Sequence, residues 1–151
     1  PEKKALKFLE EKGYTNMEPN YSLKYDGTIT FNFTYKDGDI TVYPDLIKVK
    51  VALDNGEIVG FDAATYLMNH QKRNILEPEI TMEKAREFVK IDFEIDSTRL
   101  ALIPKGKNEV LCYEFKGKYK DSDFIIYINA LNGKEEDVLQ IIKNENGTLT
   151  F

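Results

Sequence analysis

Stretches of alternating apolar and polar residues recur along this chain, and two of them are followed by an Asn-Gly pair. A period of two is typical of a β-strand with one buried face, and Asn-Gly is typical of a hairpin turn. At Asn55-Gly56 and Asn132-Gly133 we expect type I′ turns, which need positive φ at both central residues. The strands themselves are expected at residues 29–35, 47–53, 57–61, 99–103, 111–115, 124–128, 138–142 and 148–151.

Three short segments have the spacing of a helix. Residues 3–12 place apolar side chains on one face, and Gly13 follows them at a position where glycine commonly ends a helix. Residues 62–70 form a second apolar pattern of this kind. A third helix is expected after Thr81, because threonine is a favourable N-cap.

The order of these patterns indicates an internal duplication. Residues 4–8 match residues 84–88, and residues 52–56 match residues 130–133 after a one-residue gap at Asp54. A unit of ~75 residues buries only about 60% of the surface that its unfolded chain exposes and is marginally stable alone, so the two units are expected to pack together. The predicted class is α+β, with two tandem units that each pack one helix on an antiparallel sheet. The predicted boundaries are 1–70 for unit 1 (with a connecting helix at 62–70), 71–79 for a linker and 80–151 for unit 2.

Composition excludes several classes of function. The 151 residues include 21 Lys and Arg against 26 Asp and Glu, a formal net charge of -5, which argues against a nucleic-acid partner. No stretch approaches the roughly 18 apolar residues of a membrane span, so no membrane contact is expected from this fragment. The chain begins at Pro1 without Met, so we expect it to be a piece of a longer protein.

Candidate catalytic residues are few. The chain has one His and one Cys, which rules out a multi-histidine metal site and a disulfide framework. His70 lies at an expected helix end, where it can cap carbonyl groups, and Cys112 lies between apolar neighbours as a small buried residue. We therefore expect no catalytic, cofactor-binding or metal-binding residues and no cofactor.

Two charged clusters have structural interpretations. Lys116, Lys118 and Lys120 are expected to protect an edge strand from unwanted pairing, and the alternative is a contact patch for an acidic partner. The acidic residues 135–137 follow a turn and are expected to form a solvated face.

The unit of a helix, a meander and a closing Asn-Gly hairpin resembles the PepSY domain. Longer strings resemble the C-terminal region of the YpeB family of spore germination proteins, and this resemblance covers almost the whole chain. The strings are Tyr43-Pro44-Asp45, residues 48–58, Tyr66-Leu67-Met68-Asn69-His70, residues 99–104, residues 111–115 and residues 146–150.

This resemblance implies a non-enzymatic sporulation and germination protein in the bacterial endospore, outside the cytoplasm. It implies a full-length form anchored at the spore inner membrane by an N-terminal region. The implied partner is the cortex-lytic enzyme SleB, which the protein would bind, stabilise or restrain in the manner of an inhibitor or chaperone. The resemblance carries over no catalytic residue, and the partner-binding surface and the oligomeric state stay unassigned.

Two other functions remain open at this point. One is a carboxylate-dependent peptidoglycan hydrolase, which needs a cleft with two positioned carboxylates. The other is a purely structural domain of a spore layer. A binding module needs instead an exposed apolar face, on which aromatic residues anchor the partner, or a free sheet edge, to which the partner adds a strand.

Overall fold

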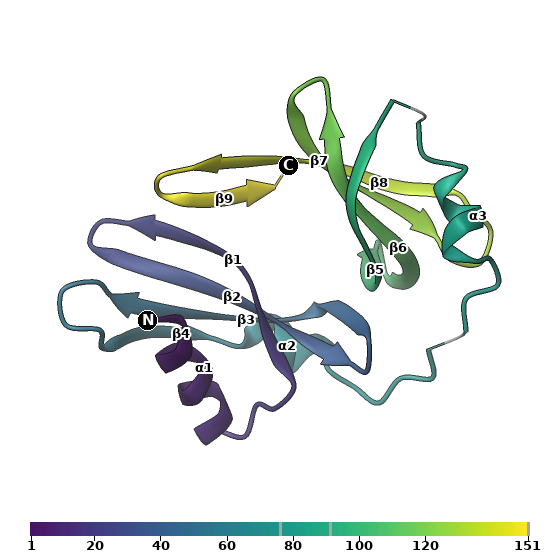
Figure 1. Ribbon diagram of the computed structural model, residues 1–151. Coiled ribbons are helices and arrows are strands. Elements are labelled where there is room, and N and C mark those ends of the chain that lie inside the picture. The colour runs from purple at the N-terminus through teal and green to yellow at the C-terminus, as the bar shows by residue number, and fades with distance from the viewer. Residues whose placement is uncertain (76, 91, 151) are drawn as a thin grey trace. The chain divides into compact units, whose positions relative to one another are not determined.

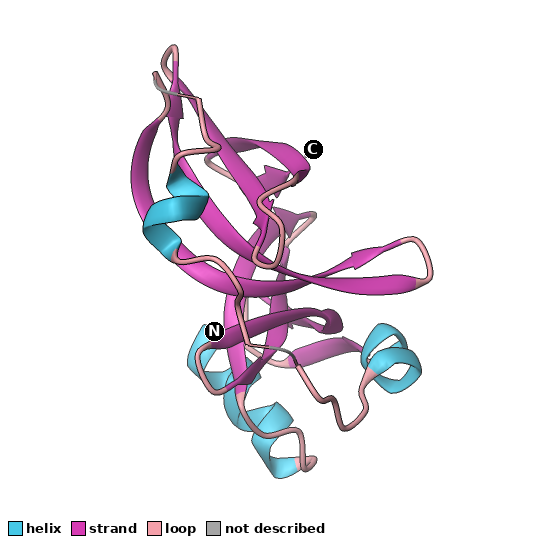
Figure 2. Ribbon diagram, turned by 90° about the vertical axis from the view of Figure 1, so that its right-hand side faces the viewer, coloured by secondary structure: helices cyan, strands magenta, loops and turns pink. Residues whose placement is uncertain are grey.

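The computed structural model describes residues 1–75, 77–90 and 92–150. Strands make up most of the ribbon, and the helices are short (Figure 2). In chain order the elements are α1 (Glu2–Glu11), β1 (Met17–Tyr25), β2 (Thr28–Asp37), β3 (Ile40–Ala52), β4 (Ile58–Asp62), α2 (Ala64–Asn69), α3 (Met82–Arg86), β5 (Glu94–Lys105), β6 (Asn108–Tyr119), β7 (Ser122–Asn129), β8 (Glu135–Asn144) and β9 (Gly147–Thr150).

The chain divides into two compact units. The first contains residues 1–38, 42–71 and 143–149, and the second contains residues 39–41, 72–142 and 150–151. The strand β3 therefore begins in the second unit and continues in the first. The proposed boundaries 1–70, 71–79 and 80–151 stay predictions. Phe151, which we expected at the end of the last strand, lies outside the described residues.

In the first unit the strands pair in the order β9-β1-β2-β3-β4. The helix α1, purple in Figure 1, contributes Ala5 and Leu9 to a core that also contains Phe33 and Val49. All four of these side chains are fully buried. The helix ends where Gly13 adopts a φ of 92°, a conformation that costs glycine little. The predicted helix at 3–12 and its end at Gly13 are confirmed to within one residue.

In the second unit the strands pair in the order β8-β7-β6-β5. Thr81 is the N-cap of α3, and its side chain accepts a hydrogen bond from the Lys84 amide at 3.1 Å, as its sequence position predicts. The helix stops at Arg86, so Phe88 falls outside it and is half exposed. Phe93 is buried instead, and its ring lies over Gly117 of β6.

The predicted fold class is wrong. Strands account for 56% of the described residues and helices for 14%, so the protein is predominantly β rather than α+β with a helix packed on each sheet. Alternation in 111–115 predicted one buried face, but Cys112 and Glu114 are as buried as Leu111 and Phe115. Both faces of β6 are therefore covered, which a single helix on one face of a sheet does not achieve.

The strands are also longer than predicted. The strand expected at 99–103 does not end before Pro104: β5 continues through Pro104 to Lys105, with Pro104 opposite Glu109 of β6. The strand β1 at residues 17–25 was not predicted, because its sequence contains Pro19 and lacks a clear alternation. The strand order does repeat: each unit has a helix followed by four strands in which consecutive strands pair.

The Asn-Gly hairpins form at the predicted places with a different turn. Gly56 and Gly133 have φ values of 72° and 78°, while neither Asn55 nor Asn132 has positive φ. In both hairpins the glycine amide donates to the carbonyl of the residue four positions earlier, at 2.9 Å. Both loops thus have the same four-residue geometry, and residues 52–57 correspond to 129–134 without a gap.

Type I′ geometry occurs elsewhere. Asp26 and Gly27 join β1 to β2 with φ values of 48° and 76°, and Lys120 and Asp121 join β6 to β7 with φ values of 48° and 67°. Positive φ at both residues of a two-residue loop matches the right-handed twist of the strands. The two additional residues of the Asn-Gly loops both precede Asn-Gly, so loop length, rather than the Asn-Gly pair itself, decides the turn type.

The two loop glycines form a matched pair for mutation. A Cβ at Gly56 would meet no atom within 4 Å, whereas a Cβ at Gly133 would lie 2.5 Å from the Phe88 ring. Gly56→Ala is expected to cost about 1 kcal/mol of unfolding free energy through positive φ alone. Gly133→Ala is expected to cost about 2 kcal/mol because it adds a steric contact. Urea denaturation of both variants tests this, and equal losses would contradict it.

Candidate functional site

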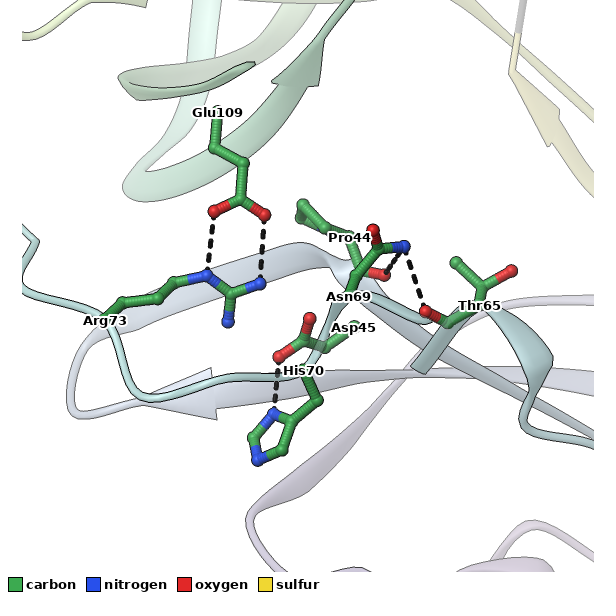
Figure 3. A network of polar contacts seen from close by, with 7 residues as sticks. All are labelled: Pro44, Asp45, Thr65, Asn69, His70, Arg73 and Glu109. Carbon is green, nitrogen blue, oxygen red and sulfur yellow. Dashed lines mark hydrogen bonds and ion pairs between the residues drawn. The ribbon is translucent and has the colours of Figure 1, made fainter. Parts of the chain in front are cut away.

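A buried carboxylate and the single histidine form the first polar cluster, in the first unit. The strand β3 carries Asp45, which is fully buried, and the C-cap position of α2 carries His70, whose side chain is 33% exposed. The Nδ1 atom of His70 lies 2.6 Å from Oδ2 of Asp45, as Figure 3 shows. Asp45 therefore orients the imidazole ring.

Aromatic rings hold the same imidazole. Tyr66 stacks on it with centroids 4.4 Å apart, and Tyr35 meets it edge-on at 4.7 Å. Burial, followed by the charges of Asp45 and the two neighbouring tyrosines, raises the pKa of Tyr66, so its hydroxyl stays protonated at neutral pH.

The neighbouring contacts indicate a structural role for this cluster. Asn69 Nδ2 donates to the carbonyl of Pro44 in β3 at 3.2 Å and, within α2, to that of Thr65 at 2.9 Å (Figure 3). Together with the contact between His70 and Asp45, the Pro44 bond ties the end of α2 to two adjacent residues of β3. The backbone amide of His70 donates to Tyr66, which ends the helix as the sequence predicted. A histidine oriented by a carboxylate corresponds to two of the three residues of a hydrolytic triad. Here the contacts of His70 with Asp45 and Tyr35 fasten the end of α2 to the sheet.

A second cluster surrounds Glu114 in the second unit. The Glu114 side chain is 1% exposed; its Oε1 accepts from Arg99 Nε and its Oε2 accepts from the Tyr127 hydroxyl, both at 2.8 Å. Lys116 Nζ lies 3.8 Å from Oε1. Because β5, β6 and β7 are adjacent strands, they bring these residues together across the sheet. This arrangement neutralises one buried carboxylate.

A third pair ties the segment that follows α2 to the second unit. Arg73 Nε and Nη2 donate to the two carboxylate oxygens of Glu109 at 2.8 and 2.9 Å (Figure 3). The Arg73 side chain is 8% exposed, so this bidentate pair is largely removed from water. It anchors the first residues after the predicted domain boundary.

Cys112 lies on β6 and is fully buried, as predicted. Burial, with the charge of Glu136 second, raises the pKa of its thiol to about 12. The thiolate is the reactive form, so this cysteine is unsuited to nucleophilic chemistry at neutral pH.

This burial gives a direct test. We expect Cys112 of the folded protein to react with Ellman's reagent at pH 8 no faster than the protein opens. In roughly 6 M guanidinium chloride, which unfolds an ordinary domain, the thiol should react at once. The measurement is absorbance of the released thiolate over time. Rapid reaction of the folded protein would contradict the burial of this thiol.

The basic residues 116–120 do not protect an edge. They lie at the end of β6, which pairs with β5 on one side and β7 on the other, so the edge-protection interpretation is wrong. Among the acidic residues 135–137, Glu135 and Asp137 are exposed, but the Glu136 side chain is only 6% exposed and lies 3.8 Å from Lys134. The predicted solvated face is correct for two of the three.

Three hollows are described within the units. One in the first unit, with a volume of about 520 Å³, is lined by Lys48, Lys50, Gly60 and Asp62 among others. Two in the second unit measure about 560 and 190 Å³. Each of these three is lined by a single carboxylate residue, which is Asp62, Glu87 or Glu135. None of the three supplies the two facing carboxylates that the hydrolase alternative needs.

In the part of the chain that the structure describes, no three His, Cys, Asp or Glu side chains gather closely enough to hold a metal ion. No helix among residues 1–75, 77–90 and 92–150 has the length and apolar character needed to span a membrane.

Sequence reasoning located His70 at a helix end but missed its partner. Asp45 is 25 residues away in sequence, and only the pairing of α2 with β3 brings the two together. The one signal that the sequence offered was an acidic residue inside the largely apolar strand 40–52. A carboxylate in such a strand needs a partner, since an unpaired buried charge is costly.

Comparisons with known proteins agree with one another. A family model described as YpeB sporulation, PepSY1 and PepSY2 domains matches residues 1–76. The sporulation protein YpeB of Halalkalibacterium halodurans is 46% identical over 136 residues, which cover 89% of this chain and 30% of that protein. YpeB of Bacillus subtilis is 40% identical over 138 residues, covering 89% of this chain and 31% of that protein.

A solved structure is similar as well. The Bacillus megaterium YpeB C-terminal domain matches with a TM-score of 0.82 and 35% identity, covering 92% of this chain and 62% of that chain. The chain thus spans about 30% of the length of the curated relatives that it matches.

Proposed function

The chain belongs to the YpeB family of sporulation proteins, and from this membership we propose that it is a non-catalytic germination module that binds the cortex-lytic enzyme SleB. In this role it stabilises or restrains the lytic enzyme through protein contact. The observation that carries the proposal is the match to sporulation proteins along 89% of the chain. The proposed location is the spore, outside the cytoplasm, with the full-length protein anchored at the inner membrane.

The arrangement of the polar clusters supports a binding role. Asp45 and His70 brace α2 against β3, and Glu114 is satisfied by Arg99 and Tyr127. The reactive form of Cys112 is suppressed by burial. The residues with catalytic potential are thus engaged in holding the fold.

Exposed apolar side chains offer contact surface for a partner. They include Tyr25 at 79% exposure and, in the second unit, Phe88 at 50%. Aromatic residues of this kind anchor protein interfaces, where a few of them carry most of the binding free energy.

The test is binding and cleavage measured together. Purified SleB is titrated with the chain in sedimentation velocity experiments, and cortex peptidoglycan cleavage is followed with and without the chain. We expect a complex at micromolar concentrations and a changed rate or lifetime of SleB activity. The chain alone should release no fragments from peptidoglycan.

Two results would overturn the proposal. Absence of any complex at tens of micromolar would remove SleB as a partner of this chain. Peptidoglycan cleavage by the chain alone, abolished by His70→Ala or Asp45→Asn in a folded protein, would establish the hydrolase instead.

A further inference from the structure

The strand β4 is a sheet edge in the first unit. In the described residues it pairs with β3 alone, and it stands at one end of the strand order (Figure 1). Its backbone groups that face away from β3 can therefore bind another extended chain. β4 runs Ile58-Val59-Gly60-Phe61-Asp62 and contains neither Lys nor Pro, the residues that commonly blunt such edges.

One face of this edge is apolar. Phe61 lies opposite Val49 of β3 and contacts Phe8 and Tyr14 with ring centroids 5.5 and 5.8 Å away. The Phe61 residue is still 40% exposed. A strand added beside β4 would cover it with every second side chain, because side chains alternate between the faces of a sheet.

The opposite face is basic and hollowed. Lys50 lies directly across from Gly60, and Lys48 lies across from Asp62. All four residues line the hollow of about 520 Å³. Because Gly60 has no side chain, nothing on β4 blocks the Lys50 side chain from the position of an added strand. Lys50 of β3 and a residue of the strand added beside β4 would be two strand spacings apart, about 9.6 Å, a distance that a lysine and a glutamate side chain can span together.

This face carries two lysine side chains although the chain is acidic overall. The chain has a formal net charge of -5, yet Lys48 and Lys50 are exposed, and neither forms an ion pair with another described residue. Asp62 is partly engaged, since its Oδ1 accepts from the Ala64 amide at 2.9 Å. The face therefore favours an anionic group opposite Gly60.

We propose that β4 accepts an extended acidic segment of a protein partner as an added strand, with a carboxylate opposite Gly60 bound by Lys50 and Lys48. Neighbouring residues of that segment are apolar and cover Phe61. The inference rests on the proposed binding role and assigns a surface and a ligand class to it. The five residues of β4 limit the docked segment to about the same length.

The experiment uses a synthetic probe of this chemistry. The ¹⁵N-labelled chain is titrated with the peptide acetyl-Val-Glu-Val-Glu-Val-amide and followed by NMR amide shifts. The comparison peptides are the Val-Lys-Val-Lys-Val counterpart and a version of the glutamate peptide with N-methylated backbone amides. We expect shifts centred on residues 58–62 and 48–50 with the glutamate peptide, and weak or no shifts with the other two.

Matched variants test the charge. Lys50→Glu should weaken binding of the glutamate peptide about tenfold or more and favour the lysine peptide, since like charges repel at the same position. Lys3→Glu makes the same charge change at a residue that neither lines the hollow nor forms the ring contacts of Phe61, and it should leave binding unchanged. Absence of shifts at millimolar peptide, shifts located elsewhere, or equal response to both charges would each overturn the proposal.

SleB binding by the same variants separates this inference from the proposed function. If SleB binds the chain and Lys50→Glu binds it equally well, the β4 surface is not the contact and the inference fails, while the proposed function stands. If SleB does not bind but the glutamate peptide docks on β4, the partner is a different protein with an acidic segment, and the inference stands.

Discussion

Gly117→Ala is expected to lower the unfolding free energy by about 3 kcal/mol or more, because a closely packed backbone has no room for the added methyl group. A Cβ at this position of β6 would overlap the carbonyl oxygen of Glu94 and would lie 2.9 Å from the Phe93 ring. The Glu94 obstacle is backbone, beside a bulge in β5 between Ile95 and Ser97, so it cannot rotate away. Urea denaturation followed by circular dichroism measures the loss.

Gly60→Ala is the matched control for this prediction. Gly60 also lies in a strand without a positive φ, and the nearest atom to its added Cβ would be Lys50 Cβ at 3.1 Å, followed by the flexible end of the same side chain. We expect a change within about 1 kcal/mol, in the range of ordinary strand substitutions. Equal losses for the two variants would show that the contact between β5 and β6 at Gly117 is not close.

Arg99→Leu is expected to destabilise the protein by about 2 kcal/mol, because it leaves the buried Glu114 carboxylate without its strongest partner. This value is below that of a fully buried pair, since the Arg99 side chain is 35% exposed and Lys116 stays 3.8 Å from the carboxylate. Tyr127 also continues to donate to Oε2. Chemical denaturation at pH 7 provides the measurement.

A double-mutant cycle supplies the control. Arg99→Leu with Glu114→Leu removes both charges, so the double variant should be more stable than the sum of the two single losses predicts. Lys116→Met should cost less than Arg99→Leu, because Lys116 makes the longer contact. Strict additivity of the two leucine substitutions would mean that Arg99 and Glu114 do not stabilise each other.

Local chemistry made several features predictable from sequence. The end of α1 at Gly13, the N-cap at Thr81 and the hairpins at Asn55-Gly56 and Asn132-Gly133 each depend on a few neighbouring residues. The burial of Cys112 followed from its apolar neighbours in β6. Family membership followed from longer strings, and the match to known sporulation proteins confirmed it.

The type of turn was less predictable, although the same residues are involved. Asn-Gly predicted positive φ at two residues, but only the glycines have it, because Ala52 and Asn129 pair with the residue that follows each glycine and so leave four-residue loops in place of two-residue ones. The pairing of the flanking strands fixes loop length, and loop length fixes the turn type. Lys120 and Asp121 have positive φ for the same reason, despite the poor preference of lysine for this region.

The sequence by itself determined the end of α1, the N-cap of α3 and the places of the two Asn-Gly hairpins, since those positions depend on caps, glycines and spacing within a few residues. Tertiary structure decided the class of the fold, because alternation in 111–115 cannot reveal that the second face of β6 is also covered. It likewise decided the partners of Asp45 and Glu114, which lie 25 and 15 residues from His70 and Arg99. Such pairings depend on strand and helix positions, and the free energy that fixes them comes from burial shared by the whole sheet.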